Sequence, residues 1–121
     1  MIIFTATDKQ WVTIQNQNQF VSPSLETEGF IHCCYPHQIL WVLNKHFIAE
    51  KGVMIVCINE NELTSKWKSE DLSQKGQDFP HVYGPINKEA VIDHFWIESD
   101  LEGIYQKNEK LSQLVDIKNN I

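Results

Sequence analysis

Two short segments of this chain carry the histidines best placed to do chemistry. Residues 28–34 read E-G-F-I-H-C-C, and residues 79–86 read F-P-H-V-Y-G-P-I. Each segment sets one histidine, His32 or His81, among apolar neighbours. Imidazole titrates near neutral pH, and it can hydrogen-bond sugar hydroxyls or act as a general acid or base. The two segments therefore define a candidate site, and the competing interpretation is that each histidine is a hydrogen-bonded core residue.

The second segment has a restricted backbone. The rings of Pro80 and Pro85 lock the φ angle of each proline and so restrict the backbone of this segment. His81 and Tyr83 lie between them, so we expect both side chains to be held in place before a ligand arrives, which lowers the ordering cost of binding. The alternative is a rigid structural turn in which the Tyr83 hydroxyl caps a neighbouring backbone group.

Metal and thiol chemistry are weaker alternatives. Strand alternation predicts that His32 and Cys34 point to one face and Cys33 to the other, so only some of these side chains and His37 could meet one ion. We therefore predict no metal site, and keep a metal bound through His32, Cys34 and His37 as a minor alternative. Cys34 could act as a nucleophile with His32 as its base, and a buried, inert cysteine is the competing interpretation.

Both segments resemble the two defining motifs of the bacterial domain-of-unknown-function 952 family, in the same order and spacing. The resemblance extends from residue 1 to about residue 105 and includes Glu70, upstream of the second motif. It implies an α+β fold similar to ADP-ribosyltransferases, a mixed half-open β-barrel with two main helices and a cleft between two sheets. Residues 30–56 are also similar to part of the RNA 2′-phosphotransferases, and His32 matches the second histidine of their H-x-H-L-S strand.

The resemblance also implies a function. We expect a small molecule in a cleft lined by the two motif histidines: a nucleotide, an NAD- or ADP-ribose-like compound, or another sugar-containing metabolite. His32, Tyr83 and Cys34 would bind it, with Cys34 in place of the serine usual in the family. His81 or Glu70 would transfer a proton or stabilise charge if the protein is a transferase. The alternative is a noncatalytic interaction module that retains the fold.

Composition limits the class of protein. The chain has 121 residues, 42% of them hydrophobic, which predicts one domain over residues 1–105 with a tail over residues 106–121. All ten basic residues are lysines and the formal net charge is −6, so we expect no nucleic-acid partner. The three cysteines are an odd number for a disulfide framework, and no apolar run approaches the ~18 residues of a membrane helix. We therefore expect a cytoplasmic protein with no membrane partner, and leave its oligomeric state open.

Strands and two helices must position these residues. Thr7 and Gln10 have the spacing of a capping box, which predicts that a helix begins there. Apolar residues at three- and four-residue spacing predict a second helix from Pro36 to near Gly52. The apolar run at residues 53–58 predicts a central strand covered on both faces.

The other segments complete the prediction. Residues 1–4, 30–34, 66–70 and 91–97 are expected to be strands, and residues 22–29 a polar turn. Short turns or single helical turns are expected at residues 59–65 and 87–90, and a last short element at 101–105. The tail is expected either to dock as an amphipathic helix or to fray.

Overall fold

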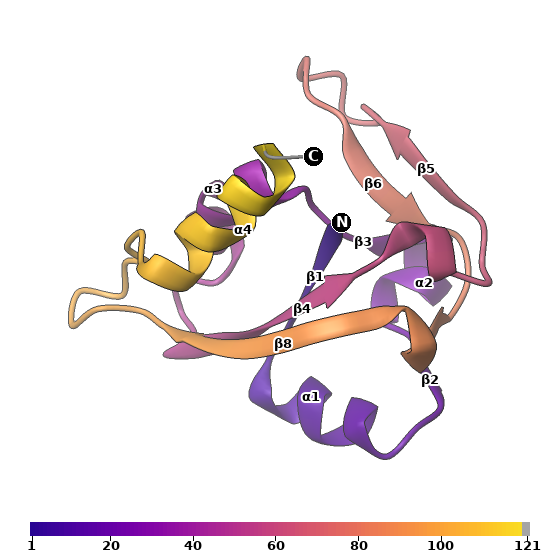
Figure 1. Cartoon of the computed structure of the whole chain (residues 1–121), viewed down its shortest axis with the longest axis horizontal. Helices are drawn as coiled ribbons and strands as arrows, with labels where there is room; N and C mark the ends of the chain where they lie inside the picture. Colours follow the sequence, from indigo (N-terminus) through magenta and orange to yellow (C-terminus); the bar gives the residue numbers. More distant parts are fainter. Residues whose placement is uncertain (120–121) are drawn as a thin grey trace.

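The computed structural model describes residues 1–119, with side chains through residue 114. Three small sheets form its centre (Figure 1). The first has the order β1-β4-β8, with β1 at Ile2–Ala6, β4 at Gly52–Ile58 and β8 at Val91–Glu98. The second pairs β2 (Gln19–Phe20) with β7 (Ile86–Asn87). The third has the order β3-β6-β5, with β3 at Ile31–His32, β6 at Phe79–Val82 and β5 at Trp67–Glu70.

The helical elements connect and cover these sheets. They are α1 (Asp8–Gln15), α2 (Pro23–Glu28), η1 (Pro36–Gln38), α3 (Ile39–His46), η2 (Glu60–Glu62), η3 (Lys88–Ala90) and α4 (Glu109–Asn119). The predicted α+β class is confirmed. Every strand pairing within the described residues is antiparallel and no sheet there closes into a barrel, so the predicted mixed half-open β-barrel is not confirmed. No helix in this part of the chain is long and apolar enough to cross a membrane.

Local sequence signals account for the first two long helices. The Thr7 side chain accepts a hydrogen bond from the Gln10 backbone, and the Gln10 side chain accepts one from the Thr7 backbone. This is the predicted capping box, which satisfies two of the free amides at the start of α1. The second predicted helix is also present, but it ends at His46 and not near Gly52.

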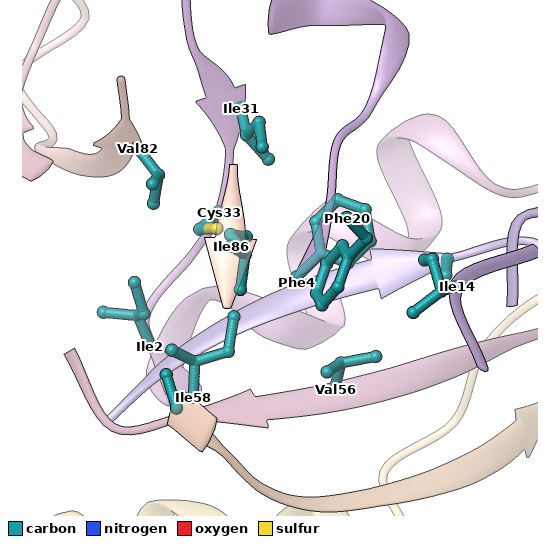
Figure 2. Packing of buried hydrophobic residues seen from close by; sticks show 12 residues of the cluster. Ile2, Phe4, Ile14, Phe20, Ile31, Cys33, Val56, Ile58, Val82 and Ile86 are labelled. Atoms are coloured by element: carbon teal, nitrogen blue, oxygen red, sulfur yellow. The ribbon is translucent and has the colours of Figure 1, made fainter. Parts of the chain in front are cut away.

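Strand β4 separates two hydrophobic clusters, as its continuous apolar run predicted. Val56 and Ile58 point into the first cluster, which lies between the central sheet and the two smaller sheets (Figure 2). Val53 and Ile55 point into the second cluster, which lies under α3 and α4. Each face of β4 is therefore covered, and none of these four side chains is exposed.

The tail docks onto the second cluster. Leu111 and Leu114 of α4 are buried there together with Leu43 of α3. In Figure 1, α3 and α4 lie on one side of the central sheet and α1 lies on the other. Of the two arrangements expected for the tail, α4 has the docked one over its described side chains. The side chain of Val115, the third apolar residue of the predicted helix face, lies outside the described residues.

Candidate functional site

The outer face of the β3-β6-β5 sheet carries the candidate residues. In the strand register His32 lies opposite His81, and His81 lies opposite Lys68. Side chains directly opposite each other in antiparallel strands share one face of the sheet, so these three residues form a row across it. Ile31 and Val82 alternate with them and are buried in the first cluster. The apolar side chains of the inner face therefore pack on the core, and the polar row lies on the opposite, outer face.

The two histidines meet although about fifty positions separate them in the chain. Their ring centroids are 5.7 Å apart, and the rings meet edge to face at 88°. The two motif histidines are therefore neighbours on one face of this sheet. The two residues differ in burial, because the His81 side chain is 6% exposed and the His32 side chain is 55% exposed.

Glu70 ties His81 to Tyr83. Nδ1 of His81 lies 3.1 Å from Oε1 of Glu70, and the Tyr83 hydroxyl donates a hydrogen bond to the same oxygen. The Tyr83 hydrogen bond, followed by the hydrogen bond and charge of His81, lowers the pKa of Glu70 below its ordinary value. The same hydrogen bond raises the pKa of Tyr83. Glu70 is thus an ionised acceptor, and Nδ1 of His81 is its donor.

This arrangement leaves the second nitrogen of His81 free. Across the described chain, no buried side-chain nitrogen or oxygen lacks a hydrogen-bond partner. Nδ1 is the ring atom that bonds Glu70, and no hydrogen bond to Nε2 is found among the described residues, so the small exposed part of this side chain is consistent with Nε2 at its surface. Because Nδ1 is the atom that bonds the carboxylate, Nε2 is the ring nitrogen left for contact with a ligand.

His32 has a carboxylate of its own. Nε2 of His32 lies 3.0 Å from Oε2 of Glu28, which is the last residue of α2. Gly29 follows with a φ of 90°, a left-handed conformation that suits glycine, and it turns the chain from α2 into β3. Residues 22–29 were predicted as a turn, so Glu28 was missed. Pro23 at the helix start and Gly29 at its end were the signals that could have found α2.

Two more residues complete the site, and the sequence did not single out either. The ring centroid of Phe30 lies 4.8 Å from that of His32, 4.3 Å from that of His81 and 5.6 Å from that of Tyr83. Phe30 therefore packs against all three rings. Nζ of Lys68 lies 5.3 Å from the centroid of the Tyr83 ring, within the range of a cation–π interaction.

Cys34 lies elsewhere. Cys33 donates its backbone N–H to Pro80 of β6, whereas Cys34 exchanges two backbone hydrogen bonds with Ile3 of β1. The chain thus passes from one sheet to another directly after His32. Cys33 and Cys34 therefore point into different clusters, as strand alternation predicted, but Cys34 is buried whereas His32 is half exposed. Cys34 is 2% exposed in the second cluster and Cys33 is buried in the first.

The position of Cys34 also affects the thiol and metal alternatives. Burial raises the pKa of Cys34 to about 12, so its thiol is protonated and unreactive at neutral pH. His37 is exposed and stacks on Tyr35, with 6.0 Å between ring centroids. In the part of the chain that is described, no three histidine, cysteine or acidic side chains are grouped to hold a metal ion.

Two surface hollows lie beside other elements. One of about 450 Å³ is lined by residues 17–21. The other, of about 420 Å³, is lined by Leu40, Trp41, Asn44 and Lys45 of α3. Neither is lined by His32 or His81, so a cleft between the motif histidines stays a prediction.

The Glu70 network should make stability depend on pH. A depressed carboxyl pKa stabilises the fold above the ordinary pKa of glutamate, and this contribution is lost as pH falls through the folded-state pKa. We expect the free energy difference between the unaltered protein and Glu70→Gln to be largest near pH ~7 and to shrink toward pH ~3, as measured by urea unfolding. A difference that stays constant over this range would show that the ionised carboxylate is not stabilised by Tyr83 and His81.

Comparison with known proteins supports the fold and leaves the chemistry open. A family model described as "Protein of unknown function (DUF952)" matches residues 5–94. The fold is similar to that of protein CC0527 from Caulobacter crescentus. In the comparison with its crystal structure the two sequences are 24% identical and the TM-score is 0.80, and the match covers 92% of this chain and 97% of that one. In the comparison with its solution NMR structure the sequence identity is 23% and the TM-score is 0.70, and the match covers 87% of this chain and 90% of that one. No curated protein matches the chain.

Proposed function

Because the chain belongs to the DUF952 family of proteins of unknown function, its own site geometry has to suggest its function, and we propose that it binds a small molecule through neighbouring hydroxyl groups. The ligand class is a nucleotide, an NAD- or ADP-ribose-like compound, or another sugar-containing metabolite. The observation that carries this proposal is the pair of carboxylate-supported imidazoles, His32 with Glu28 and His81 with Glu70, whose histidine rings are 5.7 Å apart.

The hydrogen-bonding capacity of the pair suits a ribose. Nε2 of His32 is engaged by Glu28, which leaves Nδ1 on an exposed ring for a ligand. Nε2 of His81 offers a second ring nitrogen beside it. Adjacent hydroxyls of a sugar are both donors and acceptors, so two imidazole nitrogens on one face can bind both of them. Tyr83 would line the site and, together with Phe30, hold the rings in position before binding.

The roles in a reaction follow from the same contacts. His81 would take a proton from a ligand hydroxyl at Nε2, and Glu70 would stabilise the imidazolium that forms, as a carboxylate does beside a catalytic histidine. This makes a transferase the proposed enzyme class, on an ADP-ribosyltransferase-like fold. The motif resemblance and the α+β arrangement of three small sheets support that fold assignment. Cys34 has no part in the proposal, because its side chain is buried in the second cluster.

Lys68 is the cation of the polar row. In a chain without arginine and with a net charge of −6, an anionic group of the ligand must be bound by lysine or backbone amides. A lysine binds phosphate as a point charge and not in the bidentate manner of arginine. We therefore expect single phosphates to bind better than extended polyanions, and nucleic acid to be a poor partner.

The alternative is an interaction module that retains the fold without a ligand. Large apolar side chains are exposed on separate elements, among them Val12 on α1 and Ile92 on β8. Thermal-shift screening against NAD, ADP-ribose and nucleotides separates the two functions. A ligand at ~100 times its dissociation constant adds ~2.7 kcal/mol of stability, so binding would be visible. No shift with any of these compounds would favour the interaction module.

His32→Ala tests the site with little effect on the fold. Because the His32 side chain is half exposed and its ion pair with Glu28 lies on the surface, we expect its loss to change the free energy of unfolding by less than ~1 kcal/mol. The thermal shift produced by ADP-ribose should disappear. His94→Ala is the matched control, since His94 is exposed on β8 and contacts Trp11 instead. An undiminished ligand shift in His32→Ala would contradict the proposed role of this residue.

A further inference from the structure

Trp41 connects the histidine site with a hollow on α3. Its indole borders the hollow of about 420 Å³ described above. Its ring centroid also lies 6.0 Å from that of Phe79 on β6. Phe79 precedes His81 by two positions on the same strand, so both side chains lie on the outer face of the β3-β6-β5 sheet. Trp41 thus lines the hollow and also contacts Phe79, on the face of the sheet that carries the polar row.

The exposure of Trp41 is not explained by the packing of α3. Ile39 and Leu43 supply the buried face of this helix, whereas Trp41 is 51% exposed. Leaving half of an indole in water forgoes much of the stabilisation that its burial would give. The ring is therefore available to pack against something other than the core of this chain.

Charge around the hollow favours an anionic aromatic ligand. Nζ of Lys45 lies 6.0 Å from the centroid of the Trp41 ring, and the His46 ring meets it edge-on at 6.2 Å. Partial burial, the charge of Lys45 and the charge of His32 lower the pKa of His46, in that order of size. The contact between Trp41 and Phe79 links this charged hollow to the outer face of the β3-β6-β5 sheet.

We propose that Trp41 is the stacking platform for the planar heteroaromatic ring of the ligand whose ribose is bound by His32 and His81. This inference rests on the proposed function and narrows the ligand to a nucleotide or nucleotide-like compound. The aromatic ring lies on Trp41 in the α3 hollow, and Lys45 faces a negative charge of the same molecule. Stacking of a base on an aromatic side chain tolerates different bases, so adenine and nicotinamide rings both fit this chemistry.

Calorimetric titration with ligands that have or lack the ring tests the proposal. ADP-ribose carries an adenine, whereas ribose 5-phosphate keeps a ribose and a phosphate without a base. We expect Trp41→Leu to weaken ADP-ribose binding by about 5- to 150-fold, the range for removal of a base-stacking side chain. Binding of ribose 5-phosphate should be unchanged. Trp41→Phe should restore most of the lost affinity, because it keeps an aromatic face.

Trp96→Leu is the matched control, since Trp96 is similarly exposed but lies on β8. It should leave the binding of both compounds unchanged. An equal loss for both compounds in Trp41→Leu, or no loss for either, would overturn the stacking role while the proposed function stands. Failure of the unaltered protein to bind either compound would overturn the proposed function and the inference with it. Titration with AMP and with nicotinamide mononucleotide then identifies which ring is preferred.

Discussion

Replacing His81 by alanine should abolish ligand-induced stabilisation and lower the free energy of unfolding of the unliganded protein by about 1.5–3 kcal/mol, the range for a hydrogen bond to a charged group. The side chain is 6% exposed and donates to the ionised Glu70. Its removal leaves the carboxylate with Tyr83 alone and leaves a space beside Phe30. Urea unfolding of the unliganded protein measures the loss of stability, and thermal shift with ADP-ribose measures the loss of binding.

His81→Asn separates binding from stability. The asparagine amide can still donate to Glu70, so we expect much of the lost stability to return. Asparagine has no imidazole Nε2 to meet the ligand, and the ligand shift should stay absent. If His81→Asn and His81→Ala both bind ADP-ribose as tightly as the unaltered protein, His81 is a core residue and has no role in the site.

Ile31→Ala should produce the largest loss of stability, about 2–5 kcal/mol by the range for large-to-small core substitutions. Ile31 is fully buried in the first cluster, opposite Val82 (Figure 2). It is the side chain of β3 that holds this strand on the core while His32 points outward. Chemical denaturation measures the change.

Ile92→Ala provides the matched control for this substitution. Ile92 lies on β8 and is 57% exposed, so its loss should change stability by no more than ~0.5 kcal/mol. Similar losses for the two variants would contradict the assignment of β3 to the core. We also expect Ile31→Ala to reduce ligand binding, because a loosened β3 no longer holds His32 beside His81.

Local signals made much of the scaffold predictable. The capping box at Thr7 identifies α1 because its two hydrogen bonds join residues three positions apart. The apolar run of β4 identifies a strand covered on both faces because burial on both sides removes the polar alternation. The histidine pair was also predictable, but through the motif resemblance and not through any local signal.

The parts that were missed depend on tertiary structure. Helix α2 has no buried residue, so it lacks the apolar stripe by which helices are recognised. Cys34 is fully buried because it pairs with Ile3 of the central sheet, and this long-range pairing is not visible in residues 30–34. Lys68 joins the site through its register with His81, and that pairing is not visible in the sequence.

The central claim is that His32 and His81 form one ligand site, and side-chain NMR tests it most directly. The chain has five histidines, whose ring signals can be followed in one titration with ADP-ribose. We predict that the signals of His32 and His81 shift together and saturate at the same concentration, while that of His94 on β8 does not move. Ring signals of His32 and His81 that stay unchanged at saturating ADP-ribose, NAD and nucleotides would contradict the claim.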